Sequence, residues 1–444
     1  MATAGSQTAG PQGAPRQARA LALARRPKLW LFPGVLCALV AVLLSLLYLG
    51  GIVNPTGHLH RLPIALVNAD QAPPPPGQPV NLGTQLTRAV VAGTPDDTVR
   101  WRQTDDAGAR DLLAAGKVYG VLLVPADFTA TVSALATGGA VKRPTLTVLT
   151  NPGLGSLGSS IASQIAQNAA HQASVAAGQQ LLAAVPAPGG SGGSGAQGPD
   201  TGATARLLLA DPFAVTTQVG HPIGSHSGLG LSAFYFTLLA VLTGFIGGNI
   251  IHNGVDGALG YSDSEIGPWH TRRPTVPISR TQTLLLKMLM TAGLMLVTTS
   301  LVLLCTAGIL GMDAPHQALL WVFAYCASLA VGLGVQAINA AFGGIGQLVS
   351  MFVFIALALP SSGATVPLQA VPGFYRFLAV FEPMRQLSDG IRAILFFDAR
   401  GDAGLARGWI MIAIGVALAL AFGFGMTRYY DRKGLHRWTP QPSE

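Results

Sequence analysis

The sequence predicts an α-helical integral membrane protein with six transmembrane helices and a large α/β domain inserted between the first two. Half of the 444 residues are hydrophobic and only 10% are charged, whereas soluble globular domains carry about 25% charged residues. The apolar residues gather in long runs, and the polar segment 54–228 separates the first run from the second. These two observations indicate a membrane protein with one bulky domain outside the bilayer.

Six segments approach the length of about 20 apolar residues that a helix needs to cross the hydrocarbon core. They span residues 29–53, 229–251, 288–310, 317–340, 343–360 and 408–427. The fourth and fifth come from one uncharged run, which the Gly-rich stretch Ile338–Gln347 divides into two crossings. The first run is longer than the apolar core of a cleaved signal peptide, which is about 7–15 residues, so we expect it to remain as an anchor.

The distribution of charge predicts that both chain ends lie in the cytoplasm. The basic tail 1–28, the loop 252–287 and the tail 428–444 together hold 13 Lys and Arg against five acidic residues. The other 14 basic and 14 acidic residues balance each other, so the whole net charge of +8 lies on one side of the membrane. This asymmetry is the positive-inside pattern, and it removes nucleic acid as the partner that a basic protein would suggest.

The segment 54–228 alternates strand and helix patterns, which predicts an extracytoplasmic α/β layer domain. Predicted strands lie at Leu62–Asp70, Thr98–Asp105, Val118–Phe128 and Pro144–Gly153. Predicted helices lie at Leu82–Ala92, Asp106–Gly116, Phe128–Ala136 and Ser156–Ala184. The Gly/Ser-rich stretch 188–202 is predicted to be a flexible linker.

This domain carries no nucleophile-elbow, zinc-protease or P-loop motif, so we predict no enzymatic activity, cofactor or metal. Its histidines fit no ligand spacing and are interpreted as solvated loop residues. They are His58, His60, His171, His221 and His226. The Gly-rich segment Asn151–Ser160 lacks a lysine and is interpreted as a turn and helix start rather than a phosphate site.

The predicted spans contain essentially no ionisable side chain, which argues against proton-driven antiport and against a channel with a charged ring. Their polar residues are expected to form hydrogen bonds between helices. These residues include Asn249, Gln336, Asn339 and Gln347. Any transport would draw its energy from another subunit, and because the chain has no Walker A loop, that subunit would be a separate ATPase.

The outer loop 361–407 contains an amphipathic helix, predicted at 382–397. Steps of three and four residues place Glu382, Arg385, Asp389 and Arg392 on one face. The opposite face consists of Met384, Leu387, Ile391 and Ile394. We expect a re-entrant or interfacial helix with its charged face in water or among headgroups, and with Glu382–Arg385 and Asp389–Arg392 ion pairs. It is interpreted either as an outer gate or as a packing lid.

Five stretches of the chain follow a recognisable order. They are LPIALVNAD, GVLLVPADF, TNPG before the long helix, GYSDSEIGPWHTRRPTVPISRTQTLLLK and EPMRQLSDGIRAILFFD. Together with the six spans, this order resembles the type-2 ABC exporter membrane proteins, and more narrowly their phage-infection-protein branch and the related nitrosoguanidine-resistance-like proteins. The resemblance covers nearly the whole chain, through structural landmarks rather than catalytic signatures.

The resemblance implies the permease subunit of an export system in a bacterial cytoplasmic membrane, with the lipid bilayer, a separate ABC ATPase and a second permease chain, in a homodimer or heterodimer, as partners. The inner loop would then form a short coupling helix that docks the ATPase, or it would only fix the topology. The residues expected to dock are Glu265, Trp269, Arg272 and Arg273. The alternative function is an ATPase-independent surface receptor or envelope scaffold that acts through the outer domain.

Overall fold

The computed structural model describes residues 27–75, 78–136, 143–184, 210–271 and 273–438. The chain divides into two compact units, Met1–Gly50 and Gly51–Glu444. In the first unit, helix α2 spans Pro27–Gly50. Most of the predicted basic tail, the predicted linker 188–202 and Arg272 lie outside the described residues.

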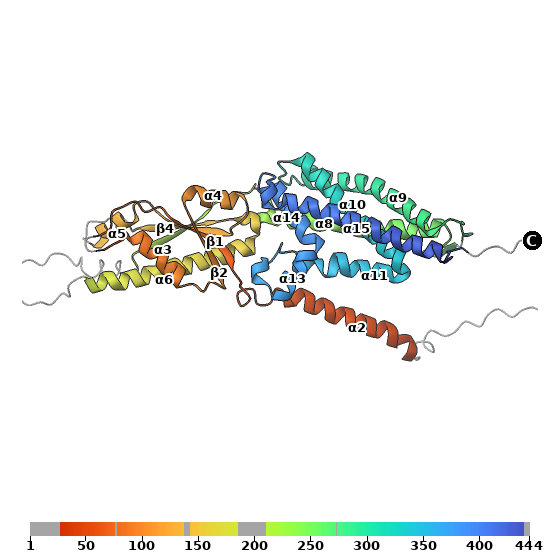
Figure 1. The fold of residues 1–444 in the computed structure, drawn as a ribbon, viewed down its shortest axis with the longest axis horizontal. Helices are drawn as coiled ribbons and strands as arrows, with labels where there is room; N and C mark the ends of the chain where they lie inside the picture. Colours follow the sequence, from red (N-terminus) through yellow and green to blue (C-terminus); the bar gives the residue numbers. More distant parts are fainter. Residues whose placement is uncertain (1–26, 76–77, 137–142, 185–209, 272, 439–444) are drawn as a thin grey trace, which may run out of the picture. The chain divides into compact units, whose positions relative to one another are not determined.

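The second unit begins with a five-stranded sheet in the order β2-β1-β3-β4-β5 (Figure 1). Its strands are β1 Leu62–Asn68, β2 Val99–Thr104, β3 Gly120–Val124, β4 Thr145–Thr150 and β5 Ala214–Val219. β1 runs parallel to β2 and β3, β4 runs antiparallel to β3, and β5 runs parallel to β4. Each of the four predicted strand segments contains a strand. The sequence analysis missed β5, because this exposed edge strand carries three consecutive polar residues and no apolar alternation.

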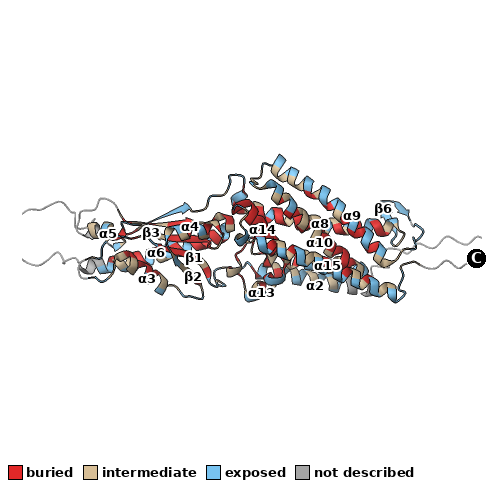
Figure 2. Cartoon of the chain, turned by 45° about the horizontal axis from the view of Figure 1, so that its top comes forward, coloured by how far each residue is buried: buried red, intermediate tan, exposed pale blue. Residues whose placement is uncertain are grey.

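Helices cover both faces of the sheet. They are α3 Leu82–Ala92, α4 Asp106–Ala114, α5 Phe128–Ala136 and α6 Ser156–Ala184. Because side chains alternate along a strand, Leu66 of β1 packs against α3, α5 and α6, whereas Ala65 and Val67 pack against α4. The α/β layering that the sequence predicts is therefore confirmed, with the buried interior that Figure 2 shows in red.

A buried aspartate after β1 fixes the starts of two helices. Asp70 accepts hydrogen bonds from the amide of Gly83 at 3.0 Å, from the amide of Thr129 at 3.2 Å and from the Thr129 hydroxyl. Asn81 caps α3 by accepting from the Thr84 amide at 2.9 Å. First-turn amides have no partner within their own helix, so these side chains satisfy donors that would otherwise be unpaired where α3 and α5 begin.

The rest of the second unit is mostly helical. Its helices are α8 Ser232–Ala258, α9 Arg280–Leu303, α10 Gln317–Phe342, α11 Gly346–Met351, α12 Ala358–Ser361, α13 Gly373–Phe381, α14 Pro383–Phe396 and α15 Leu405–Arg432. A short two-stranded hairpin, β6 Ser264–Ile266 and β7 Trp269–Thr271, lies between α8 and α9.

Among the described residues, four segments are long and apolar enough to cross a membrane. They are Ser232–Ala258, Arg280–Ile309, Gln317–Ser361 and Leu405–Arg432. Two of them continue through short π-helical turns, at Leu304–Ile309 and Phe352–Ala356. The chain is thus a mostly helical membrane protein, which is the coarse architecture that its composition predicts.

The longest of these four segments turns back on itself. Gly343 has φ +61°, a conformation that side chains rarely adopt, and a short 3₁₀ turn follows. A Cβ atom added to Gly346 would lie 2.7 Å from the Asn339 Cα, and one added to Gly334 would lie 2.6 Å from the ring of Phe354. The two arms therefore pack side by side, and the Gly-rich break lies where the sequence predicts it.

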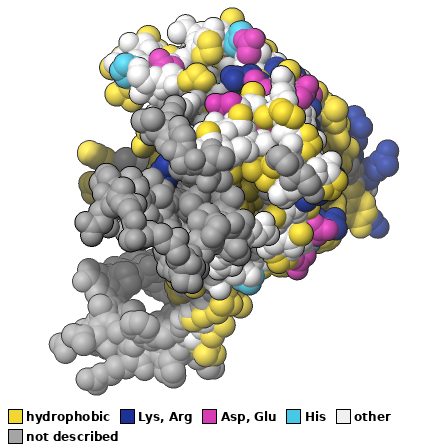
Figure 3. Space-filling model, turned by 90° about the vertical axis from the view of Figure 1, so that its left-hand side faces the viewer, with side chains coloured by type: hydrophobic (Ala, Val, Ile, Leu, Met, Phe, Trp, Pro, Cys, Tyr) yellow, Lys and Arg dark blue, Asp and Glu magenta, His cyan; other side chains and the backbone are white. Residues whose placement is uncertain are grey.

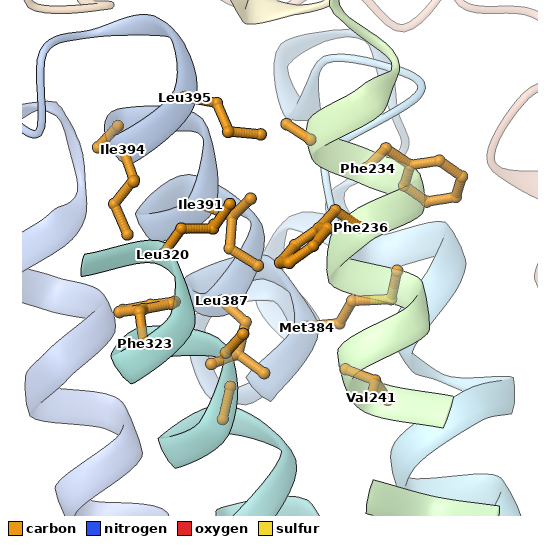
Figure 4. Packing of buried hydrophobic residues seen from close by; sticks show 14 of the residues in the cluster. Phe234, Phe236, Val241, Leu320, Phe323, Met384, Leu387, Ile391, Ile394 and Leu395 are labelled. Atoms are coloured by element: carbon orange, nitrogen blue, oxygen red, sulfur yellow. The ribbon is translucent and has the colours of Figure 1, made fainter. Parts of the chain in front are cut away.

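Helix α14 is part of the core that it forms with α8, α10 and α15. Figure 4 shows Leu387 and Ile391 of α14 next to Phe236 of α8, with Phe323 of α10 close by. Phe236, Phe323 and Ile391 are at most 1% exposed. The helix is therefore integrated into the bundle and does not lie on its surface.

Hydrogen bonds join α8 to α10 along their length. Ser328 donates to the carbonyl of Ala240 at 2.9 Å, and Gln336 donates to the carbonyl of Gly248 at 3.0 Å. Asn339 donates to the side chain of Asn249 at 3.0 Å. The expectation that polar residues of the spans bond between helices is confirmed for these pairs.

Gly244 sets the separation of α8 and α10, because a Cβ atom there would lie 2.4 Å from the carbonyl oxygen of Ser328. We expect Gly244→Ala to lower the free energy of unfolding by about 1–3 kcal/mol through overpacking. Gly254 on the same helix has no heavy atom within 4 Å of an added Cβ, so Gly254→Ala should be neutral or stabilising. Thermal unfolding of both variants in detergent tests this; equal melting temperatures would contradict the close approach.

Candidate functional site

Helix α14 begins at a proline and is capped by the glutamate before it. Pro383 occupies the first helical position, where its missing N–H is not needed. The Glu382 carboxylate accepts a hydrogen bond from the Met384 amide at 2.7 Å. The observed helix, Pro383–Phe396, agrees with the predicted range within one residue at each end. Its predicted apolar face is fully buried in the helical core.

Two of the four residues on the charged face of α14 are buried, whereas the sequence predicts that this face meets water or headgroups. Arg392 is 4% exposed and Glu382 is 5% exposed, so neither meets water or headgroups as predicted. Arg392 donates to the carbonyls of Ala364 at 2.7 Å and Gly363 at 3.3 Å. The segment before α13 therefore covers this face, because its carbonyls supply partners that a buried guanidinium requires.

Ion pairs along this face are centred on Asp389. Its carboxylate lies 3.8 Å from Arg392, as predicted, and 3.5 Å from Arg385. The predicted Glu382–Arg385 pair is replaced by the cap, in which the Glu382 carboxylate accepts from backbone amides at the helix start. The carboxyl oxygen of Glu382 satisfies first-turn amides that have no partner within the helix. Burial also favours the protonated carboxyl, which cannot form an ion pair with Arg385.

A polar cavity of about 160 Å³ lies where α14 meets the α/β domain. We call it the junction cavity. The charged and polar side chains that line it come from three parts of the chain, namely Lys117 and Tyr119 beside β3, Gln369 in the segment before α13, and Arg385, Asp389 and Arg392 on α14. The sequence analysis brought together only the three residues of α14, because Tyr119 and Gln369 belong to no motif and are far apart in the chain.

The junction cavity holds more positive than negative charge on its α14 side, since two guanidinium groups share the single carboxylate of Asp389. The phenol of Tyr119 donates to the side-chain oxygen of Gln369 at 3.2 Å. Burial raises the pKa of Tyr119 to about 12, so this group remains a neutral donor at physiological pH. The cavity therefore suits a small polar or anionic group.

Two exposed ion pairs join the α/β domain to the segment that follows α14. Arg400 lies 2.8 Å from Asp111 of α4. Lys117 forms an ion pair with Asp402. Hydrogen bonds from Lys117 and Arg400 hold the pKa of Asp402 below its usual range. Exposed pairs contribute little stability individually, so their main effect is to fix the register of the two surfaces.

Aromatic packing strengthens the same junction. The ring of Phe397 lies 2.9 Å from the position of a Cβ atom on Gly116 and 3.0 Å from one on Gly153. His221 stacks on Phe397 with ring centroids 5.5 Å apart and donates to the carbonyl of Phe396 at 2.8 Å. His221 was interpreted as a solvated loop residue, and that interpretation is wrong because the residue packs against the end of α14.

The loop expected to form a coupling helix forms the β6–β7 hairpin instead. Its two-residue connection contains Gly267 with φ +59°, followed by Pro268, which suits a tight hairpin turn. Trp269 is 73% exposed. Glu265 and Arg273 line an open groove of about 620 Å³ between the hairpin and the end of α8, whereas Arg272 lies outside the described residues.

A buried ion cluster lies at the end of the bundle formed by the C-terminus of α8, the N-terminus of α9 and the C-terminus of α15. We call this the far end. Lys287 lies 2.7 Å from Asp256 and 2.9 Å from His252. Arg437 donates two hydrogen bonds to the Asp256 carboxylate, of 2.8 and 2.9 Å.

The sequence analysis assigned His252, Asp256 and Lys287 to the inner loop 252–287. Helix α8 in fact continues to Ala258 and α9 begins at Arg280. The helices therefore carry ionisable residues near this end, contrary to the expectation. The i, i+4 spacing of His252 and Asp256 was the available signal, but Arg437 could not be linked to them from sequence.

Residues 34–415 match a family described as "Protein of unknown function (DUF3533)", so the chain belongs to this family. The match includes the α/β domain, the junction cavity and α14. No curated protein matches the chain, and no solved structure matches it.

Arg392→Met should weaken the junction, because it leaves two buried carbonyls without a donor and removes one partner of Asp389. We expect the free energy of unfolding to fall by about 1.5–3 kcal/mol. Arg407→Met, at an exposed position of α15, should change it by less than about 0.5 kcal/mol. Thermal unfolding in detergent compares them, and similar losses in both would refute the importance of the buried guanidinium.

Burial raises the pKa of Glu382 to about 8, although two backbone hydrogen bonds oppose the shift. The native state then binds one more proton than the unfolded state between pH about 4.5 and 8. The free energy of unfolding should therefore fall as the pH rises through this window, by up to about 1.4 kcal/mol per unit.

Unfolding measured from pH 5 to 8 tests this prediction with a matched pair of variants. Glu382→Gln should flatten the slope, whereas Glu265→Gln, at an exposed position, should keep it. The prediction fails if the wild type and Glu382→Gln share the same pH profile.

Proposed function

We propose that this member of the DUF3533 family is the membrane permease subunit of a type-2 ABC export system, driven by a separate ATPase. In this proposal the chain crosses the membrane six times, through α2, α8, α9, the two arms of the Gln317–Ser361 hairpin, and α15. The length of α2, 24 residues, and the reversal at Gly343 support the two crossings beyond the four long segments.

The proposed orientation places the α/β domain outside the cell and the far end in the cytoplasm. Basic residues gather at the far end, in the first turns of α9, in the loop before it and at the end of α15; they are Arg273, Arg280, Lys287, Arg432 and Lys433. The described face of the α/β domain in Figure 3 instead mixes basic and acidic side chains among uncharged ones. This contrast matches the positive-inside rule.

The observation that carries the proposal is the double packing of α14. Its apolar face belongs to the core with α8, α10 and α15, and its charged face lines the junction cavity with residues of the α/β domain. Any relative movement of these helices would therefore be transmitted to the outer domain through α14. This position favours the gate interpretation over a lid that only covers the bundle.

The β6–β7 hairpin is the proposed docking element for the ATPase. It presents Trp269 to solvent beside a groove lined by Glu265 and Arg273. An exposed tryptophan flanked by charges of both signs is a typical interface anchor. The second permease chain is proposed to pack on outward small residues, such as Gly415 of α15, which has no heavy atom within 4 Å of an added Cβ.

A receptor or envelope scaffold is the second candidate function, and strand β5 favours it. Five of its six residues are exposed, and within the described residues it pairs only with β4. An exposed edge strand offers unpaired amides and carbonyls to an incoming strand of another protein. In this alternative the α/β domain is the working part, and no ATPase is required.

Purification of the full-length protein from its native host in mild detergent, followed by mass spectrometry, separates the two functions. We expect a stoichiometric ATPase with a Walker motif to accompany the wild type and to be lost from Glu265→Ala/Trp269→Ala. Tyr235→Ala, an exposed aromatic residue at the other end of α8, should retain it. Envelope proteins without any ATPase would overturn the permease proposal in favour of the scaffold.

A further inference from the structure

The far end contains a second cavity, of about 250 Å³, which neither the gate nor the docking hairpin uses. It lies among the ends of α8, α9, α10 and α15, and we call it the inner cavity. Its lining includes Arg280, Lys287, Arg437, His252 and Ala340. Since a water molecule occupies about 30 Å³ in the liquid, the space accommodates a tetrahedral oxyanion together with several waters.

Positive charge dominates the inner cavity. Three cationic side chains line it, and the carboxylate of Asp256 is the group that pairs with two of them, Lys287 and Arg437. Arg280 is the third cation, and its Nε donates to the carbonyl of Leu435 at 2.6 Å. A guanidinium group carries five N–H donors, so this bond leaves Arg280 with donors for a ligand.

A second carboxylate, that of Asp431, is not part of the cavity lining and already accepts several hydrogen bonds from the start of α9. Asp431 accepts from the amides of Arg280 and Thr281 at 2.9 and 3.0 Å, and from the Thr281 hydroxyl at 2.7 Å. It thereby satisfies the first turn of α9. The N-terminus of α9 is therefore not the available anion site, and the cations of the inner cavity act as a separate group.

The cationic side chains are held in place rather than extended into solvent. Lys287 is 4% exposed, and Arg437 lies over the ring of Tyr261, with 4.7 Å from Cζ to the ring centroid. Arg280 lies over Tyr430 at 5.3 Å. Cations fixed in this way around a partly enclosed space lose little freedom when an anion binds, and arginine is especially suited to phosphoryl oxygens.

We propose that the inner cavity binds a phosphoryl oxyanion, held by Arg280, Lys287 and Arg437. Two sources present this chemistry, namely the headgroup of an anionic phospholipid and free phosphate. Its position among the ends of α8, α9, α10 and α15, all of which belong to apolar segments, favours the headgroup, because basic pockets between membrane helices collect anionic lipids. The inference does not depend on the export function, since it requires only the cations and the cavity.

The test uses the full-length protein in micelles that contain phosphatidylcholine. Its melting temperature is followed as phosphatidylglycerol replaces part of that lipid, and separately as inorganic phosphate replaces chloride at constant ionic strength. We expect saturable stabilisation by phosphatidylglycerol. Saturation by inorganic phosphate at similar concentrations would identify free phosphate as the source, and the oxyanion site itself would stand.

Two variants and one control make the assignment specific. Arg280→Gln removes a donor that does not hold Asp256, and Ala340→Asp places a carboxylate inside the cavity, where it would compete with the ligand. Each should weaken the anion response at least about tenfold. Arg428→Gln, at an exposed position of α15 outside the cavity lining, should leave it unchanged.

The proposal is overturned if neither anion stabilises the wild type beyond its matched neutral lipid or chloride control. It is equally overturned if Ala340→Asp, folded and cooperatively unfolding, responds to the anion as the wild type does. Should Arg280→Gln not fold, the Ala340→Asp result decides alone, because that change adds a partner for the existing cations.

Discussion

Burying the charged face of a helix costs free energy unless each charge finds a partner, and α14 meets this requirement within the protein. Arg392 donates to two backbone carbonyls, and Asp389 lies between two arginines. Glu382, which burial keeps protonated below about pH 8, caps the helix start. The opposite face can then enter the core with α8, α10 and α15. The junction cavity and the contacts of the α/β domain both depend on this arrangement, because α14 is their common wall.

Features set by neighbouring residues could be predicted from the sequence. Stretches rich in β-branched residues and bounded by Gly, Pro or Asp located β1 to β4. The Gly-rich break located the reversal at Gly343, and steps of three and four residues located both faces of α14. What covers those faces could not be predicted, because the partners of Arg392 are carbonyls about thirty residues away along the chain. The same reason hid the ion cluster, where Arg437 reaches Asp256 across the bundle. The hairpin β6–β7 was missed because the coupling helix was expected from the family resemblance and not from the residues of the loop.

The partners of the buried cations differ between the two ends of the bundle. At the junction, Arg392 uses backbone carbonyls and shares one carboxylate with Arg385, so the cluster is nearly satisfied by the chain itself. At the far end, the carboxylate of Asp256 serves two cations while a third faces the same space. The first arrangement holds two parts of the protein together, whereas the second leaves positive potential that something outside the chain can neutralise.

The order of the strands has a consequence for how the α/β domain is connected. β1 and β5 run in opposite directions through the sheet, so the chain enters and leaves the domain at the same end of its strands. Pro63 lines the junction cavity, and His221 contacts the last residue of α14. A segment whose two ends meet can be removed or exchanged with little disturbance to its host. The α/β domain is therefore an insertion that could be exchanged for another domain while the helical bundle keeps its structure.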